Sequence, residues 1–266
     1  MARELRQAHL EAIRRLAAGA LAALDHGDQR ETARLAMAAG RLCEEIAGRW
    51  TPAAVEVMAR LGGKDVAAIS APPPQMGGMP PFWMSYVSVE DADAATAKAR
   101  ELDANLISEP FDVFDSGRMA VIQDPQGAVF AVRQPKQHIG ASLVNAPGAF
   151  TWNQGSFPDP EAAKRFYGDL FGWTFVESSE FEGPNAAIRN ADKTNGGLSG
   201  LPAPEVPPNW GVSFTVEDLD AAADKVRSSG GQVLVGPEPM GRIGRFLVAV
   251  DPQGGTFGLY EGEVDP

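Results

Sequence analysis

GRMAVIQDPQGAVFAV (residues 117–132) and GRFLVAVDPQGGTFGL (residues 244–259) are two versions of one segment, and they decide the fold. They close a longer repeat, because residues 80–132 align without a gap with residues 207–259 at an offset of 127. An internal repeat of this length fixes the architecture before any single residue is interpreted.

Each copy of the repeat predicts the same order of elements. A stretch with the two-residue period of a strand comes first, WMSYVSV or WGVSFTV, and an acidic pair then caps an Ala-rich amphipathic helix. Three further strands follow, and the last two are joined by Asp-Pro-Gln-Gly, a turn in which Pro sets φ and Gly permits a positive φ. We therefore expect a βαβββ unit in each copy.

Two more units are indicated outside the aligned copies. Residues 148–175 predict another strand and capped helix, followed by a hairpin, which makes a third unit between the two copies. Residues 60–70 resemble residues 193–199 at an offset of 129, so a first unit keeps its closing hairpin, turning at Gly62 and Gly63. No Trp-containing strand precedes that hairpin near residue 23.

Residues 3–48 instead predict two helices joined at His26, Gly27 and Asp28. Leu35, Ala39, Leu42 and Ile46 have the spacing of an amphipathic helix. We expect this helical segment to replace the opening part of the first unit.

Composition limits the possible functions. The chain has 266 residues, of which 44% are hydrophobic and 22% charged, as in folded globular proteins. A formal net charge of −12 disfavours nucleic acid as a partner, and no apolar stretch near the N-terminus is long enough to span a bilayer. A cytoplasmic protein is expected, without an internal disulfide or a cysteine-based metal cage, because Cys43 is the single cysteine.

The string DPEAAKRFYGDLFGW, the two Asp-Pro-Gln-Gly strand pairs and the fourfold unit resemble the glyoxalase/bleomycin-resistance (vicinal oxygen chelate) superfamily, in particular its two-domain bacterial glyoxalase-like or hydroxylase-like branch. The resemblance covers residues 53–262. It implies an α+β fold in which tandem βαβββ units form curled mixed sheets around a cavity. The expected divisions are a helical segment 1–52, an incomplete first domain 53–136, a linker 137–147 and a complete second domain 148–262.

The resemblance also implies where a metal would be held. Metal-dependent members place ligands on the first strand of each unit and a carboxylate near the end of the last strand. Alignment on the three capping aspartates fills these five positions with Met84, Ala131, Trp152, Gly211 and Gly258, none of which ligates a metal through its side chain. The three histidines, His9, His26 and His138, lie off these strands. No metal and no other cofactor is therefore expected.

The cavity lining follows from the alternation of side chains along a strand, since residues two apart face the same way. Residues that share parity with the lost ligand positions include Ser88, Gly211 and nine candidate ligand-binding residues. These are Met84, Tyr86, Trp152, Gln154, Ser156, Ser213, Thr215, Thr256 and Tyr260. Aromatic, small and hydroxyl side chains suit an apolar or aromatic small molecule. The competing interpretation is that Trp and Met side chains fill a cavity that no longer binds anything.

Two other pairs recur at the repeat offset. Arg118 and Arg245 could clamp an acidic substrate, although pairing with surface acids is the favoured interpretation. Trp83 and Trp210 point away from the predicted cavity and are expected to pack between sheet and helix.

Four functional hypotheses remain open from the sequence. The favoured one is a metal-independent protein that binds a hydrophobic or aromatic small molecule, for example a natural product, in the curled sheet. The alternatives are a cofactor-free tailoring enzyme (hydroxylase-like, lyase or isomerase) that uses Tyr86, Gln154 and Tyr260, a metal-dependent glyoxalase or dioxygenase, and an interaction protein that docks through its helical N-terminus. No catalytic residue is assigned. The expected partner is a small molecule, with neither nucleic acid nor membrane, and the protein is expected to be a monomer or homodimer.

Overall fold

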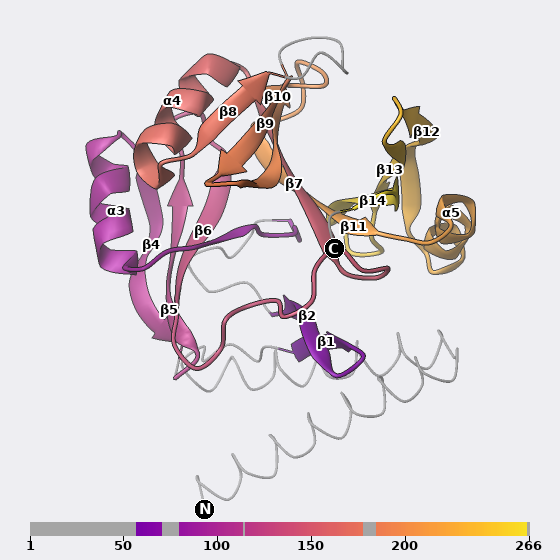
Figure 1. Ribbon diagram of the computed structural model, residues 1–266, viewed down its shortest axis with the longest axis horizontal. Helices are drawn as coiled ribbons and strands as arrows, with labels where there is room; N and C mark the ends of the chain where they lie inside the picture. The colour runs from indigo at the N-terminus through magenta and orange to yellow at the C-terminus, as the bar shows by residue number, and fades with distance from the viewer. Residues whose placement is uncertain (1–56, 71–79, 114, 178–184, 265–266) are drawn as a thin grey trace, which may run out of the picture. The chain divides into compact units, whose positions relative to one another are not determined.

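The computed structural model describes residues 57–70, 80–113, 115–177 and 185–264 (Figure 1). The helical segment predicted for residues 1–52 lies outside these residues. The chain divides into two compact units, and the larger one, Arg60–Ala67 with Gly78–Pro266, contains the elements from β3 onward. Within the described ranges, no helix combines the length and apolar character needed to cross a bilayer.

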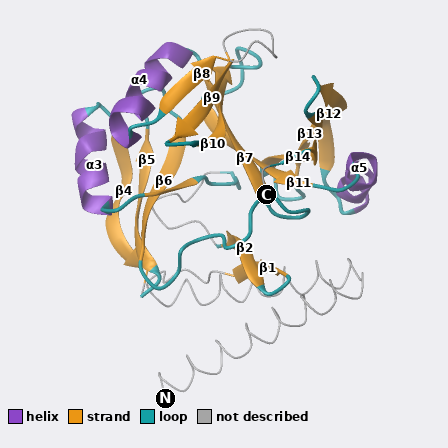
Figure 2. Ribbon diagram, viewed as in Figure 1, coloured by secondary structure: helices purple, strands orange, loops and turns teal. Residues whose placement is uncertain are grey.

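Three complete βαβββ units are present, as the repeat predicts (Figure 2). The second unit consists of β3 (Tyr86–Ser88), α3 (Ala92–Glu101), β4 (Asn105–Val113), β5 (Gly117–Gln123) and β6 (Val129–Pro135). The third consists of β7 (Phe150–Phe157), α4 (Pro160–Phe171), β8 (Thr174–Glu177), β9 (Asn185–Asn190) and β10 (Lys193–Gly200). The fourth consists of β11 (Asn209–Thr215), α5 (Leu219–Ser228), β12 (Gln232–Met240), β13 (Gly244–Val250) and β14 (Thr256–Gly262).

The closing hairpin of the first unit is also present. It consists of β1 (Val57–Leu61) and β2 (Lys64–Ile69), and it turns at Gly62 and Gly63 as predicted. Both glycines have a positive φ, +57° and +79°, which side-chain-bearing residues rarely adopt.

Local sequence explains where the helices begin and how the last strands are connected. The side chains of Asp91, Asp159 and Asp218 cap the three helices, each accepting a hydrogen bond from the backbone N–H three residues later. In the Asp-Pro-Gln-Gly turns, Oδ1 of Asp124 and of Asp251 accepts two backbone N–H groups. The two copies of the repeat therefore share the hydrogen bonds of the turn as well as its amino-acid sequence.

The units assemble into mixed sheets. The third and fourth units form one eight-stranded sheet in the order β12-β13-β14-β11-β7-β10-β9-β8. In each unit the opening strand pairs in parallel with the closing strand, and antiparallel pairing of β7 with β11 joins the two units. The second unit forms a separate four-stranded sheet, β3-β6-β5-β4. The α+β class with mixed sheets is confirmed.

The main hydrophobic core is shared by the second and third units. The ring of Phe130 on β6 makes edge-on contacts with Phe166, Tyr167 and Phe171 of α4, at centroid distances of 6.4, 5.5 and 5.9 Å. Such aromatic pairs add roughly 0.5–1.5 kcal/mol each beyond the area that they bury. The fourth unit has a smaller core of its own, built from Leu219, Ala223, Leu247, Ala249 and Leu259.

Candidate functional site

Strand β7 presents different side chains to the two faces of the eight-stranded sheet. A Cβ placed on Gly155 would lie 2.6 Å from the ring of Phe157 and 3.1 Å from that of Trp210, on the face covered by α4. A Cβ placed on Gly197 would instead meet Oε1 of Gln154 at 2.5 Å and the indole of Trp152 at 3.1 Å. Trp152 and Gln154 therefore lie on the opposite face, above the backbone of β10.

These two side chains are joined by hydrogen bonds. The indole Nε1 of Trp152 donates to Oε1 of Gln154 at 3.1 Å, and Nε2 of Gln154 donates to Oγ of Ser199 at 3.1 Å. The half-buried side-chain amide of Gln154 therefore has a hydrogen-bond partner for each of its polar atoms: Trp152 for the oxygen and Ser199 for the nitrogen. Sequence reasoning missed Ser199, although the parallel pairing of β10 with β7, which places it beside Ser156, would have identified it.

The neighbouring strands continue this surface. Ser213 pairs with Trp152 and with Gly258, and Gly211 pairs with Gln154, so they share its face. Thr215 pairs with Tyr260. We call this surface the Trp152 face. It comprises Trp152, Gln154, Ser156, Ser199, Gly211, Ser213, Thr215, Gly258 and Tyr260, with Thr256 exposed at the end of β14.

The Trp152 face is open to a ligand at Gly211 but closed at Thr215. A Cβ on Gly211 would meet only the carbonyl oxygen of Gln154, at 3.7 Å, so the sheet is bare at this point. Thr215 is 4% exposed, and its Oγ1 has no hydrogen-bond partner among the described residues. A buried hydroxyl without a partner costs about 1–3 kcal/mol, but this oxygen is closed to a water-sized probe, so it is not presented to a ligand.

Tyr260 lies at the end of the Trp152 face and is already engaged. Its hydroxyl donates to the carbonyl oxygens of Ile243 and Glu263, the latter at 3.2 Å. Burial raises the pKa of Tyr260, and the nearby charge of Glu263 adds to this effect. The phenol is therefore a poorer proton donor than a free tyrosine.

The two candidates from the second unit lie elsewhere. Met84 precedes β3, and Tyr86, which is 49% exposed, lines a cleft of about 740 Å³. This cleft lies on the α4 side of β7, where Ser85 Oγ donates to Oδ1 of Asn153 at 2.5 Å. The structure therefore groups seven of the nine predicted residues around the eight-stranded sheet and places Tyr86 in a separate hollow. This cleft could not be predicted from the sequence, because it arises from packing between units.

The residues present do not fit the superfamily's metal centre. A side chain at Gly258, one of the carboxylate positions, would lie 2.3 Å from Oγ of Ser213, so the site could not hold a carboxylate without rearrangement. Among the described residues no three His, Cys, Asp or Glu side chains converge as metal ligands. Nε2 of His138 is hydrogen-bonded to Oδ2 of Asp65 at 2.9 Å.

The repeated arginines pair with surface acids, as the favoured interpretation predicted. Arg118 makes two bonds to Asp93, at 2.6 and 2.8 Å, and Arg245 makes two to Asp220, at 2.9 and 3.1 Å. Each acid lies in the first turn of its unit's helix, and its hydrogen bond with the guanidinium lowers its pKa. Each of these ion pairs therefore connects a strand of the sheet to the first turn of the helix in the same unit.

A sequence model of the Glyoxalase/Bleomycin resistance protein/Dioxygenase superfamily matches residues 44–132 and 156–259. The chain belongs to this superfamily. "Putative glyoxylase CFP32" of Mycobacterium tuberculosis (strain CDC 1551 / Oshkosh) is 40% identical over 206 residues, which cover 77% of this chain and 79% of that protein. "Anthracycline biosynthesis protein DauV" of Streptomyces sp. (strain C5) is 32% identical over 194 residues, 69% of this chain and 67% of that protein.

Among solved structures, the Mn(II)-bound glyoxalase from Novosphingobium aromaticivorans superposes with a TM-score of 0.50 at 18% identity. The match covers 68% of this chain and 63% of that one, so the chain spans under two thirds of the glyoxalase's length. At this identity the likeness concerns the superfamily's fold alone.

Proposed function

We propose that this superfamily member binds a flat aromatic or hydrophobic small molecule on the Trp152 face, without a metal ion. The observation that carries the proposal is the fixed indole of Trp152, held by Gln154 and Ser199 beside the bare backbone at Gly211. An aromatic wall next to a surface free of side chains is suited to stacking a planar ring.

Two considerations support a metal-independent mode of binding. The five superfamily ligand positions hold none of the imidazole or carboxylate side chains that such a centre uses, and Ser213 occupies the space that a carboxylate at position 258 would need. A relative named for anthracycline biosynthesis is consistent with a polycyclic aromatic ligand.

A tailoring enzyme is the second candidate, and the names of the anthracycline biosynthesis relatives favour it. Its weakness lies in the residues that would transfer protons. Tyr260 has a raised pKa and donates to backbone carbonyls, while Gln154 is not a base. Binding without turnover therefore remains the better proposal.

The experiment titrates 1,8-dihydroxyanthraquinone into the full-length protein and follows quenching of tryptophan fluorescence. We expect saturable binding that Trp152→Ala weakens at least tenfold, because the stacking wall is removed. Asn153→Ala is the matched control, since its side chain lies on the other face of the same strand and lines the cleft. It should leave the affinity unchanged.

The opposite pattern, loss with Asn153→Ala and none with Trp152→Ala, would move the ligand to the cleft and overturn the proposal. Elemental analysis of the purified protein tests the metal-independent part separately. A stoichiometric transition metal would contradict it. Conversion of the quinone or of a co-purifying compound during incubation would favour the enzyme.

A further inference from the structure

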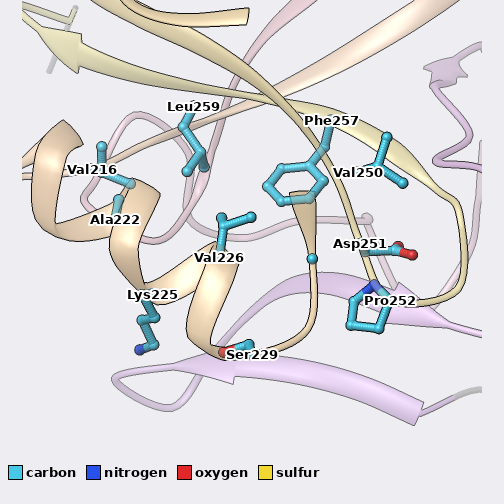
Figure 3. Close-up of a pocket in the computed structure, with 11 residues that line it drawn as sticks. Val216, Ala222, Lys225, Val226, Ser229, Val250, Asp251, Pro252, Phe257 and Leu259 are labelled. Atoms are coloured by element: carbon cyan, nitrogen blue, oxygen red, sulfur yellow. The ribbon is translucent and has the colours of Figure 1, made fainter. Parts of the chain in front are cut away.

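Two hollows outside the Trp152 face occupy the same place in the repeat. One is the cleft of about 740 Å³ that Tyr86 lines, and the other, beside α5, has a volume of about 290 Å³ (Figure 3). Four residues that line the cleft recur, with the same amino acid, 127 positions later in the lining of the hollow beside α5. In the cleft these are Val89, Ala95, Lys98 and Phe130. The two hollows therefore share a floor in which a phenylalanine ring lies beside a helix.

The third unit gives the cleft a wall that has no counterpart in the hollow beside α5. Among the described residues, the lining of that hollow belongs to the fourth unit alone and is mostly apolar. The wall of the cleft combines aromatic rings with amide and hydroxyl side chains. It includes Phe150, Thr151 and Asn153 of β7, Trp173 just before β8, and Asn190 at the end of β9. The cleft can therefore offer hydrogen bonds that the hollow beside α5 cannot.

Trp173 supplies this wall with a fixed ring whose polar atom is open to solvent. Its indole stacks on the ring of Tyr167, with 6.0 Å between centroids and 20° between planes, and lies 4.9 Å from the ring of Phe171. In the described chain, the buried side-chain polar atoms without a partner belong to Trp83 and Thr215. Nε1 of Trp173 also has no partner among the described residues, yet it is not one of these buried atoms. A molecule in the cleft can therefore reach it.

Asn190 and Ser88 add two neutral polar groups to the lining. Both side chains are exposed, and neither has a hydrogen-bond partner within the part of the chain that the structure describes. An amide and a hydroxyl can each donate and accept, which matches a ligand whose own groups do both. The charged side chains of the lining are Glu90, Asp91 and Lys98. Two carboxylates against one ammonium group disfavour an anionic ligand.

We propose that the cleft binds a neutral sugar ring. An apolar C–H face of the ring packs against the aromatic side chains of the wall, while its hydroxyls exchange hydrogen bonds with Asn190 and accept from Nε1 of Trp173. A ring without hydroxyls would displace water from these groups and leave them without partners. The volume of about 740 Å³ lies within the range of roughly 300–1,000 Å³ for ligand pockets. This site is independent of the ligand proposed for the Trp152 face.

The test titrates methyl β-D-glucopyranoside into the ¹⁵N-labelled full-length protein and follows the indole N–H resonances. The resonance of Trp173 is assigned by its loss in Trp173→Phe, and that of Trp152 by its loss in Trp152→Phe. We expect saturable movement of the Trp173 resonance. Tetrahydropyran-2-methanol, which keeps the ring but lacks its ring hydroxyls, should bind at least about fivefold more weakly. D-glucuronate should also bind more weakly, because its carboxylate meets those of Glu90 and Asp91.

Variants locate the site. Asn190→Ala removes an exposed amide of the wall and should weaken the glucoside about fivefold. Asn105→Ala is the matched control, because it removes an exposed amide at the start of β4 that does not line the cleft, and it should leave the affinity unchanged. Each of four results would overturn the proposal: no saturable movement of the Trp173 resonance, movement of the Trp152 resonance in its place, equal affinity for the ring without hydroxyls, or equal effects of the two variants.

Discussion

The hydroxyl of Tyr167 on α4 donates to Oδ2 of Asp124 in the second unit's turn at 2.7 Å, across 43 residues of chain. The hydroxyl oxygen of Tyr167 in turn accepts from Nε1 of Trp210 at 2.8 Å. Elements from three βαβββ units therefore meet at one buried phenol. Burial raises the pKa of Tyr167 well above its usual value, so the hydroxyl stays protonated and keeps donating.

Tyr167→Phe removes this donor and acceptor while preserving the ring contacts. We expect it to lower the free energy of unfolding by about 1–3 kcal/mol, because Asp124 and Trp210 are left with unsatisfied buried groups. Urea denaturation monitored by circular dichroism measures the loss. Tyr260→Phe is the control, because that hydroxyl bonds to exposed carbonyls and should cost less. Equal losses of unfolding free energy in the two variants would show that the buried hydroxyl of Tyr167 contributes no more to stability than the exposed one of Tyr260.

Asp124 gives the protein a specific pH dependence. Burial raises the pKa of Asp124 above its ordinary value of 3.8, so the folded state holds this proton more tightly than the unfolded state. Its contribution to stability is therefore complete below pH 3.8 and is lost as the pH rises through the raised pKa. Asp124→Asn should remove this decline, although the variant is less stable overall because the hydroxyl of Tyr167 loses its acceptor. The measurement is the free energy of unfolding from pH 3.5 to 7; the same slope in both proteins would contradict the assignment.

Two glycines on neighbouring strands should respond differently to one added methyl group. Gly155→Ala would drive its Cβ into the rings of Phe157 and Trp210, and such overpacking typically costs about 1–3 kcal/mol. Gly211→Ala meets only the carbonyl of Gln154 at 3.7 Å and should be nearly neutral in stability. Thermal unfolding of the pair tests this, and a large loss for Gly211→Ala would show that its face is not open. The same variant should weaken a ligand stacked on the Trp152 face.

Restoring a carboxylate at a superfamily ligand position should fail without a second change. Gly258→Asp places its Cβ 2.3 Å from Oγ of Ser213 and is expected to destabilise the protein. Ser213→Ala combined with Gly258→Asp should recover part of that loss, because the clashing oxygen is gone. Calorimetry with Mn²⁺ should detect no tight binding to either variant; stoichiometric binding to the double variant would show that the other donors suffice.

The ion pairs Arg118–Asp93 and Arg245–Asp220 are expected to contribute little to the stability of the fold. Both are substantially exposed to water, so Arg118→Ala or Arg245→Ala should change the free energy of unfolding by roughly 1 kcal/mol or less. The small loss should shrink further at high salt, which thermal unfolding at two salt concentrations measures. Ligand binding on the Trp152 face should be unaffected, whereas a substrate-clamping role would reduce it.

The sequence predicted those parts of the fold that depend on local signals. Asp91, Asp159 and Asp218 begin helices as their positions indicated, and the alternation along β7 placed Trp152 and Gln154 on one face. The packing between units could not be read in this way. The bond between Tyr167 and Asp124 joins residues with no local relation, and the cleft that contains Tyr86 exists only because two units meet. The helical segment expected for residues 1–52 remains a prediction.

The shared core of the second and third units also bears on how this chain could be dissected. The sequence predicts a linker at residues 137–147, which makes this segment an obvious place at which to cut an expression fragment. A fragment starting at residue 148 would nevertheless expose to water the rings of Phe166, Tyr167 and Phe171 that contact Phe130. Such a fragment should aggregate, because the units that repeat in the sequence do not coincide with the units that bury a complete hydrophobic core.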